Sequence, residues 1–365
     1  MPKPAAAEVD AGGRAVRVSS PDRVIYEATD RTPEVTKLMV AEYFASVEDG
    51  LMRALHDRPT ALERWTSGVR EGMRLATGPQ DKDADAFYQK RVPKGAPDYV
   101  ETVQVTFPSG RTADEICPTE IAVPVWCAHM GTLVFHPWPV RRATGVDAWE
   151  DHPDELRIDL DPQPGTSFAD AVRVAGVARE LLEELGLVGY PKTSGNRGVH
   201  IYVRIEPRWE FTDVRHAAIG FGRELARRDE GVTMAWWKEE RGERIFVDFN
   251  QNNRDRTIAS AYSLRPLPGA PVSTPLTWEE LAGVTDPRAF NLFTVPDRVA
   301  DGDPWASIDD TAYSLEPLLR LWEELPGGEM SFPPDYPKMP GEPPRVQPSK
   351  KVAAHWDEEG NRIES

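Results

Sequence analysis

Apolar and polar residues alternate through residues 155–162, ELRIDLDP, and this alternation predicts a β-strand. Side chains two residues apart in a strand point to the same face. One face therefore carries Leu156, Ile158 and Leu160, and the other carries Arg157, Asp159 and Asp161. Two like charges on one face repel each other unless a positive group lies between them, so the pattern indicates a cation beside the two aspartates.

Three longer segments repeat their apolar residues at helical spacing. We expect helices over residues 34–56, 168–185 and 212–228. Ser167 and Asp170 are spaced as a capping pair at the start of the second helix, and Gly186 ends it. Thr212 is the expected cap of the third helix.

Shorter apolar runs predict the remaining strands. They lie at 131–138, at 199–205 after the turn KTSGNRG, and at 244–252, RIFVDFNQN. Strands and helices therefore alternate in this part of the chain, which favours an α/β or α+β sheet domain.

The composition is that of a folded protein. The 365 residues include eleven tryptophans and are 40% hydrophobic, which is enough for one large or two ordinary domains. The net charge of −17 argues by itself against a nucleic-acid partner. Residues 191–265 nevertheless carry 14 Lys and Arg against 11 Asp and Glu, so a basic patch on an acidic body is compatible with the sequence.

The sequence contains no signal for a membrane or for export. No apolar run is long enough to span a bilayer, and the first residues lack the apolar core of a secretory signal. Cys117 and Cys127 lack metal-ligand spacing, and we expect reduced thiols, with a bridge between them as the alternative. We therefore expect a cytoplasmic protein with no membrane partner.

The two aspartates of the predicted strand have two interpretations. Acidic residues before a proline are common where a strand enters a turn, so Asp159 and Asp161 are compatible with a plain strand end. They also suit a metal site, because hard divalent cations prefer carboxylate oxygens. Asp248, inside an apolar run, is the candidate third ligand, since an unpaired acid there would be costly.

The turn TSGNRGVH, residues 193–200, is a candidate anion site. Its two glycines let backbone amides approach an anion closely, and Ser194, Arg197 and His200 add polar groups. The alternative is an ordinary turn with a surface histidine. The segment is not a P-loop, because the spacing and the Lys-Ser/Thr pair are absent.

Three arginines follow the third aspartate: Arg254, Arg256 and Arg265. They suit either a solvated loop or the neutralisation of a triphosphate, because arginine contacts phosphate in bidentate fashion. The acids, the turn and the arginines together favour in-line phosphoryl or nucleotidyl transfer with metal ions. A Ser-His-Asp hydrolase would need a G-x-S-x-G elbow, and zinc would need other ligands.

At these motifs the chain resembles the archaeo-eukaryotic primase superfamily, and most closely the polymerase domain of bacterial ligase D with its stand-alone primase-polymerase relatives. The motifs that carry the resemblance are DLDP at 159–162, TSGNRGVHIYV at 193–203 and VDFNQN at 247–252, followed by AYSLRP. Flanking matches are HDRPTALERWTSGV at 56–69, FYQKRVPKGAPDYV at 87–100 and FHPWPVRR at 135–142. The resemblance runs from about Ser19 to about Trp322.

The resemblance implies an α+β fold with central, mainly antiparallel sheets flanked by helices. The implied catalytic domain spans 16–325, with a 5′-phosphate pocket in its N-terminal part and the metal and nucleotide site at 150–270. We expect residues 1–15 to be flexible and residues 326–365 to form a Pro-rich, charged tail. We also expect a stand-alone enzyme, without attached ligase or nuclease domains.

The resemblance also implies residue roles. The catalytic acids, which would bind two Mn²⁺ or Mg²⁺ ions, are Asp159, Asp161 and Asp248. The incoming nucleoside triphosphate would be held by Ser194, Arg197, His200 and Arg265, with His136 near its sugar. Phe87 and Tyr88 would stack on a base, and Arg23 and Lys37 would bind a downstream DNA 5′-phosphate.

Three positions depart from the family pattern. Arg23 and Arg197 stand where the family often has lysine, which keeps the charge and changes its geometry. Glu63 stands where close relatives carry a basic residue near the nucleotide, which puts one phosphate contact in question.

We therefore expect a template-dependent DNA primase-polymerase that extends primers and fills short gaps or ends during DNA repair, non-homologous end joining included, and that accepts ribonucleotides. Expected partners are NTP or dNTP, DNA with a gap, nick or end bearing a 5′-phosphate, and a separate DNA ligase or end-binding protein. Its action would be at the bacterial nucleoid. Two alternatives stay open: a non-catalytic DNA-end or gap-binding module of the same fold, and a nuclease that uses the same metals.

Overall fold

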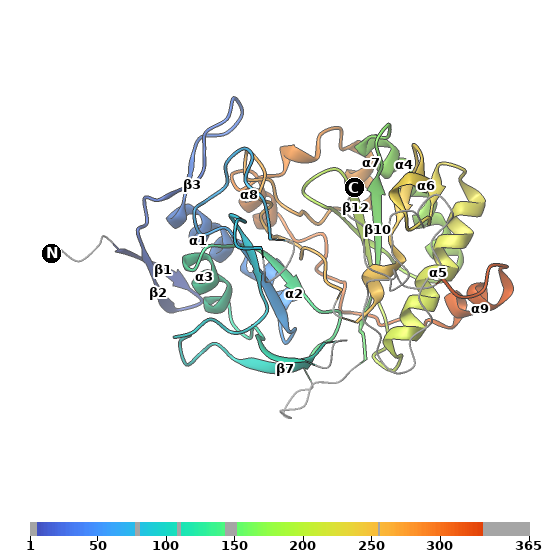
Figure 1. Ribbon diagram of the computed structural model, residues 1–365, viewed down its shortest axis with the longest axis horizontal. Helices are drawn as coiled ribbons and strands as arrows, with labels where there is room; N and C mark the ends of the chain where they lie inside the picture. The colour runs from blue at the N-terminus through green and yellow to red at the C-terminus, as the bar shows by residue number, and fades with distance from the viewer. Residues whose placement is uncertain (1–5, 77–80, 108–110, 143–151, 255, 331–365) are drawn as a thin grey trace.

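The computed structural model describes residues 6–76, 81–107, 111–142, 152–254 and 256–330. Figure 1 shows two halves side by side, each built on a β-sheet and covered by helices. The sheets are mainly antiparallel, which confirms the expected α+β fold class.

The N-terminal half contains β1 (Ala6–Ala11), β2 (Arg14–Ser19), β3 (Val24–Tyr26), β4 (Val35–Thr36), α1 (Lys37–Ser46), α2 (Glu48–Leu55), β5 (Thr60–Arg64), β6 (Phe87–Gln89), β7 (Thr102–Thr106), β8 (Thr112–Ile116), α3 (Ala122–His129) and β9 (Thr132–Pro137). Its main sheet has the order β6-β5-β8-β7, with β9 also paired to β5. Two small hairpins, β1-β2 and β3-β4, lie beside it.

The chain continues through β10 (Glu155–Pro162), α4 (Phe168–Glu184), β11 (Tyr190–Thr193), β12 (Val199–Arg204), α5 (Phe211–Arg228), β13 (Val232–Thr233), α6 (Lys238–Arg241), β14 (Ile245–Val247), the 3₁₀ turn η1 (Phe249–Asn252), α7 (Trp278–Gly283), the 3₁₀ turn η2 (Pro287–Ala289), α8 (Val295–Ala300) and α9 (Glu316–Glu324). The second sheet has the order β11-β12-β10-β14-β13. The segment around α8 returns to the N-terminal half, where Leu292 and Val295 join its core.

Strand β10 is the middle strand of the second sheet. It pairs antiparallel with β12 and with β14, and the register places Asp159 opposite His200. The three apolar residues of β10 are buried together with the inner faces of α4 and α5. The predicted alternation along β10 is therefore confirmed, and it directs the charged face away from this core.

The segment 34–56, predicted as one helix, forms two. α1 and α2 are separated at Val47, whose φ of −109° and ψ of 26° are not helical. Gly50 in α2 lies directly against the ring of Tyr262, where a Cβ atom would stand 2.2 Å from a ring carbon. The tertiary contact with Tyr262 thus fixes the position of α2, and the helical apolar stripe does not reveal it.

Two predicted helix starts have different outcomes. Asp170 accepts hydrogen bonds from the backbone N and the Oγ of Ser167 at 2.8 and 2.7 Å, so the predicted capping pair of α4 is confirmed. The expected cap of α5 at Thr212 is wrong. There Asp213 accepts a hydrogen bond from the backbone N of Glu210, which starts the helix at Phe211.

The expectation of a flexible segment over residues 1–15 is wrong for residues 6–15. β1 pairs antiparallel with β2 along its whole length, and Gly12 and Gly13, both at positive φ, form the turn. The inward side chains of both strands are buried in the core of the N-terminal half. The pair Gly-Gly thus marks a hairpin turn rather than a mobile end.

The ends of the chain beyond these elements lie outside the described residues. This applies to residues 1–5 and to residues 331–365 of the expected tail. The described start of the tail contacts α5, because His216 and Glu329 lie 2.6 Å apart.

A cluster of buried charges lies where the two sheets meet. Arg58 donates two hydrogen bonds to Asp154, at 2.6 and 2.7 Å, and pairs with Glu155 at 2.9 Å. Arg204 on β12 contacts the same two acids at 3.1 and 3.0 Å. A buried ion is stable only when partners replace its lost hydration, and here each acid has more than one arginine.

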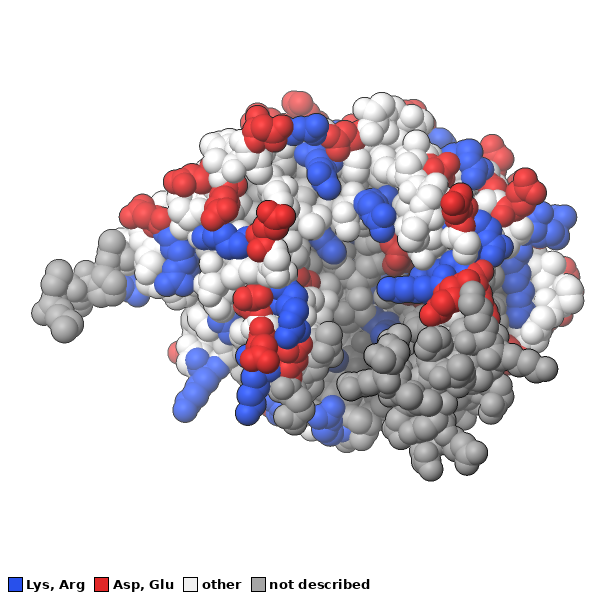
Figure 2. Space-filling view, turned by 45° about the horizontal axis from the view of Figure 1, so that its top comes forward, with Lys and Arg blue, Asp and Glu red and all other residues white. Residues whose placement is uncertain are grey.

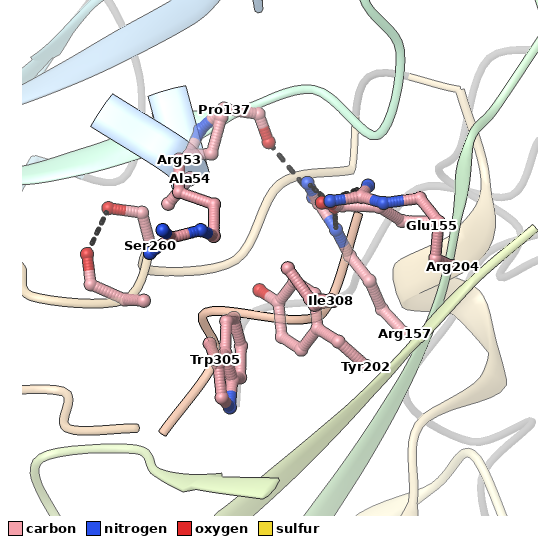
Figure 3. A pocket seen from close by; sticks show the side chains of 11 residues that line it. Arg53, Ala54, Pro137, Glu155, Arg157, Tyr202, Arg204, Ser260, Trp305 and Ile308 are labelled. Carbon is pink, nitrogen blue, oxygen red and sulfur yellow. Dashed lines mark hydrogen bonds and ion pairs between the residues drawn. The ribbon is translucent and has the colours of Figure 1, made fainter. Parts of the chain in front are cut away.

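Arg157 links this cluster to the N-terminal sheet. Its Nε and Nη2 donate to Glu155 at 2.9 and 2.7 Å, and its Nη1 donates to the carbonyl of Pro137 at the end of β9, at 2.9 Å (Figure 3). Burial alone would raise the pKa of Glu155, but the surrounding arginines hold it well below its usual range. The charges therefore stay ionised and tie β10 to β9.

No helix within the described ranges combines the length and the apolar character that a bilayer span requires. Cys117 and Cys127 are buried and carry free thiols, which confirms the expectation that they are not bridged.

We predict that Arg58→Met lowers the free energy of unfolding by about 3–5 kcal/mol, because it leaves buried carboxylates with too few cations. Urea unfolding monitored by tryptophan fluorescence would measure the loss. Arg208→Met is the matched control, since Arg208 is exposed and its ion pairs with Glu206 and Glu316 are exposed too, and it should cost far less. Equal losses in the two variants would contradict the role of the buried cluster.

Candidate active site

Three acidic side chains meet at one corner of the second sheet. Asp159 and Asp161 lie on β10, and Asp248 directly follows β14. The sequence predicts Asp248 inside a strand, and this is wrong: its carboxylate accepts a hydrogen bond from the backbone N of Asn250 at 3.0 Å and starts η1. The backbone N of Asp248 donates to the carbonyl of Asp159 at 3.1 Å, so the two segments still run side by side.

Two amide side chains hold η1 against β10. Asn252 accepts from the backbone N of Arg157 at 2.9 Å and donates to its carbonyl at 2.8 Å. Gln251 donates to Asp248 at 3.1 Å and to Asp159 at 3.4 Å. The carboxylates of Asp159 and Asp248 therefore lie on the same side of the sheet. These two amides are not among the residues predicted from the sequence, although both lie within the run FNQN next to Asp248.

The corner holds more negative charge than its neighbours balance. The carboxylate of Asp159 and partial burial raise the pKa of Asp161 to about 7. Burial, together with Asp159, raises the pKa of Asp248 to about 7. Burial also raises the pKa of Asp159 to about 6, against the opposing effect of Lys192 and Arg265. Because Asp161 is exposed at the end of β10, the repulsion from Asp159 is the main cause there.

The donor set at this corner fits a hard divalent cation. Carboxylate oxygens are the preferred ligands of Mg²⁺ and Mn²⁺, and Oδ1 of Asp159 is buried without a hydrogen-bond partner in the described part of the chain. Across the described residues, no three His, Cys, Asp or Glu side chains already surround one point as ligands. Carboxylates that repel one another are expected to stay apart until a cation draws them together.

The predicted anion turn is closed by Ser194. Its Oγ accepts hydrogen bonds from the backbone N of Asn196 and of Gly198, at 3.2 and 3.0 Å. Gly195 has a φ of +73°, and a Cβ atom there would stand 2.4 Å from Cγ of Arg265. Glycine therefore lets Arg265 lie directly against the turn, as a site for a polyanion requires.

His200 connects the turn to the acids. Its Nε2 lies 3.3 Å from Oδ1 of Asp159, and its Nδ1 lies 2.8 Å from Nζ of Lys192. Lys192 is fully buried and also donates to the carbonyl of Ala259 at 3.0 Å. Burial lowers the pKa of both Lys192 and His200. Lys192 is not among the site residues predicted from the sequence, although it directly precedes the turn motif.

Most of these groups line one open cavity of about 250 Å³; Asp248 and Lys192 are not in its wall and lie behind Gln251 and His200, which are. The predicted site residues in its wall are His136, Asp159, Asp161, Ser194, Arg197, His200 and Arg265. Figure 2 shows one face hollowed between the two halves, with Lys and Arg atoms at its rim. Arg254 is not in the wall: its guanidinium lies over the ring of Phe211, 4.9 Å from the centroid. Proximity in sequence to Asp248 did not determine where this side chain points.

The predicted aromatic pair lies on β6, next to the cavity. Phe87 and Tyr88 are 39% and 45% exposed, which is unusual for such large apolar side chains. The ring of Tyr88 meets the ring of His136 edge to face, with centroids 5.1 Å apart. Since His136 lines the cavity, Tyr88 is positioned at its edge, whereas Phe87, the preceding strand residue, lies under the guanidinium of Arg64, 5.2 Å from the ring centroid.

The two residues predicted for the 5′-phosphate lie in a separate positive cluster. The Nζ of Lys37 donates to the carbonyl of Ser19 at 2.9 Å, and burial with the nearby Arg23 lowers the pKa of Lys37 to about 8. Burial, Lys37 and Arg17 lower the pKa of His129 to about 4. No carboxylate in the described residues forms an ion pair with Lys37, Arg23 or Arg17, although Glu8 stands opposite Arg17 in the register of β1 and β2.

Glu63, which departs from the family pattern, lies on β5 in the wall behind His136. Its carboxylate accepts a hydrogen bond from Nε1 of Trp65 at 2.8 Å and lies 3.0 Å from Nε2 of His136. It therefore contacts the site through another side chain.

The chain is similar to known proteins in sequence and in structure. The family model described as LigD, primase-polymerase domain, matches residues 36–305. Two multifunctional non-homologous end joining proteins LigD, from Pseudomonas aeruginosa PAO1 and Mycolicibacterium smegmatis, are 30% and 31% identical over 84% and 81% of this chain. The chain spans about a third of the length of these curated relatives, 34% and 36%.

A solved structure extends this similarity to the fold. It is the polymerase domain from Mycobacterium tuberculosis ligase D in complex with DNA, with a TM-score of 0.71 and 28% sequence identity. The match covers 82% of this chain and 99% of that domain.

We predict that the metal-free protein loses stability as the pH rises from about 4 to about 7. The folded acids keep their protons to about pH 6 or 7, whereas unfolded aspartates lose theirs near pH 4, so the folded state binds more protons across this window. Asp159→Asn with Asp248→Asn should flatten this dependence, measured by urea unfolding in a chelator at several pH values.

The exposed Asp310 supplies the control, since Asp310→Asn should leave the slope unchanged. At pH 7.5, Mn²⁺ should raise the thermal midpoint of the wild type and have no effect on the double Asn variant. A midpoint shift of equal size in both proteins would contradict the metal site.

Proposed function

Because the chain belongs to the family of LigD primase-polymerase domains, we propose that it is a template-dependent nucleotidyltransferase that extends a DNA primer. The observation that carries this proposal is the convergence of Asp159, Asp161 and Asp248 next to an anion turn. Nucleotidyl transfer needs a cation site and a triphosphate site within one cavity, and this pair of features supports it.

The proposed cofactor is a pair of divalent cations, Mn²⁺ or Mg²⁺, held by the three carboxylates. When bound, such ions make the primer 3′-hydroxyl more acidic and neutralise charge on the departing pyrophosphate. Gln251 would keep the carboxylates of Asp159 and Asp248 aligned, because it already donates to both.

The turn and the arginines would hold the triphosphate. The guanidinium groups of Arg197 and Arg265 supply donors at the cavity wall. His136 would face the sugar, and Tyr88 with Phe87 would stack on a base, a contact that tolerates any sequence. Arg254 has no part in this proposal, because its guanidinium lies over Phe211.

We propose that the DNA substrate is a gap, nick or end with a downstream 5′-phosphate, bound at Arg23 and Lys37. A positive cluster that forms no ion pair within the described residues, in a chain of net charge −17, supports a phosphate ligand there. The proposed context is DNA repair by end joining, with a separate ligase or end-binding protein and with ribonucleotides accepted. Its similarity to non-homologous end joining proteins LigD supports the end-joining context.

Two other functions are less well supported. A non-catalytic DNA-end or gap-binding module would have no use for three acids with raised pKa values, which destabilise the folded protein unless a cation is bound. A nuclease would use the same metals but would not need the turn with Arg265, which suits a triphosphate. The same assay distinguishes all three, since only the polymerase releases pyrophosphate.

We predict primer extension on a duplex with a short gap, in the presence of Mn²⁺ and nucleotide, with stoichiometric pyrophosphate release. Asp159→Ala with Asp161→Ala should abolish extension, because the proposed cation site is lost. Arg208→Ala, on the outer surface, should extend normally. Undiminished extension by the double alanine variant would remove the site assignment.

We predict that the protein prefers gapped DNA with a 5′-phosphate over the same DNA with a 5′-hydroxyl, and that Lys37→Ala reduces this preference about tenfold. Because the pKa of Lys37 is about 8, the wild-type preference should fall as the pH rises from 7 to 9. Fluorescence anisotropy with labelled DNA would measure it.

Arg stays charged across this range, so Lys37→Arg is the control and should keep a preference that does not change with pH. If phosphorylation of the DNA makes no difference to wild-type binding, the 5′-phosphate site is not at Lys37.

A further inference from the structure

One acid near the nucleotide cavity has no role in the metal or triphosphate site. Glu63 is only 4% exposed, and protein groups replace water at both of its carboxylate oxygens: Nε1 of Trp65 lies at 2.8 Å from one, and Nε2 of His136 at 3.0 Å from the other. Burial alone would raise the pKa of Glu63, but the hydrogen bonds from His136 and Trp65 lower it below its usual value. The carboxylate is therefore ionised and can only accept hydrogen bonds.

The ionised carboxylate of Glu63 determines which ring nitrogen of His136 carries the proton. An ionised carboxylate within 3.0 Å of Nε2 requires that Nε2 carries a hydrogen. Burial also lowers the pKa of His136, which keeps the ring neutral. A neutral imidazole with its proton on Nε2 has a lone pair on Nδ1, so Nδ1 is an acceptor.

The acceptor Nδ1 of His136 is available to a ligand. No hydrogen-bond partner of Nδ1 lies among the described residues, and Nδ1 is not one of the fully buried polar atoms that lack a partner. The ring lines the cavity that also contains Asp159 and Arg265, and the edge-to-face contact with Tyr88 fixes its orientation. A phosphate oxygen has no hydrogen to donate, whereas a sugar hydroxyl has one.

We propose that Glu63 is a positioning residue for sugar selection: it holds His136 in the tautomer whose Nδ1 accepts a hydrogen bond from a hydroxyl of the incoming nucleotide. The inference rests on the proposed polymerase function, and it defines the substrate by a hydroxyl donor on the ribose. The 2′- and the 3′-hydroxyl share this chemistry, and the test separates them.

The neighbouring tryptophan makes Glu63→Gln a sharp test. Nε1 of Trp65 can only donate, so the new amide must turn its oxygen toward Trp65 and its NH₂ toward His136. His136 must then accept at Nε2 and carry its proton on Nδ1. The same ring at the same place thus changes from an acceptor to a donor toward the cavity.

Removing the tryptophan donor frees the amide. In Glu63→Gln with Trp65→Phe, the amide oxygen can face His136 again, which restores the original tautomer. Trp65→Phe alone keeps Glu63 and should keep the tautomer as well. Circular dichroism and thermal midpoints would confirm that all variants fold, and a purely structural role of Glu63 predicts no such reversal.

Nitrogen-15 NMR of the imidazole rings reads the tautomer without any catalysis. The protein has seven histidines, so the signals of His136 are assigned as those lost in His136→Ala. We expect a protonated Nε2 in the wild type, a protonated Nδ1 in Glu63→Gln, and a protonated Nε2 again in the double variant. A wild-type ring with its proton on Nδ1, or a ring that does not respond to Glu63→Gln, would overturn the proposal.

Single-nucleotide addition to a gapped duplex tests the consequence. The kcat/KM values are compared for a ribonucleotide, its 2′-deoxy analogue and its 3′-deoxy analogue. The wild type should disfavour the analogue that lacks the recognised hydroxyl, and Glu63→Gln should reduce this preference about tenfold, with recovery in the double variant. The analogue lacking that hydroxyl should itself be little affected.

A tautomer that inverts without any change in these ratios would refute sugar selection. A wild type that adds no nucleotide at all would refute the proposed function and sugar selection with it. In that case the NMR measurement still decides whether Glu63 controls the tautomer of His136, so the two failures are distinguishable.

Discussion

The candidate site depends on the pairing of β10 with a strand on each side. The backbone hydrogen bonds to β12 place His200 opposite Asp159, and those to β14 deliver Asp248 beside Asp159. Three segments far apart in sequence therefore contribute to one corner through the register of a single strand. A slip of one residue would turn the aspartates of β10 into the core and its leucines into the cavity.

The pKa values of two groups of acids on and beside β10 are shifted in opposite directions. Asp154 and Glu155 are surrounded by arginines, and the pKa of Glu155 stays well below its usual range. A few residues further along β10, Asp159 lacks a comparable set of cations, and burial raises its pKa to about 6. The first group has its counter-charges within the chain and serves the fold. The second group has too few positive charges nearby to balance its carboxylates, which is the physical reason to regard it as a cation-binding site.

The sequence predicts what repeats locally and misses what depends on tertiary pairing. Alternation identified β10 and its charged face, and apolar periodicity identified α4 with its capping pair. The packing of Gly50 in α2 against Tyr262 joins residues far apart in sequence, and the placement of Arg254 depends on which way a loop turns. Lys192 and Gln251 belong to the site through contacts with His200 and Asp159 that only the folded sheet creates.

The buried charges between the sheets also limit how this protein can vary over evolutionary time. The members of this buried cluster contact one another closely, so replacing any one of them with an uncharged residue leaves a buried ion without its partner. They are Arg58, Asp154, Glu155, Arg157 and Arg204. Viable lineages must therefore keep the whole group or exchange several members together. Because this cluster joins the two sheets, the spacing between the walls of the cleft is expected to change little during evolution. New substrate preferences are therefore expected to arise from side chains at the rim of the cleft.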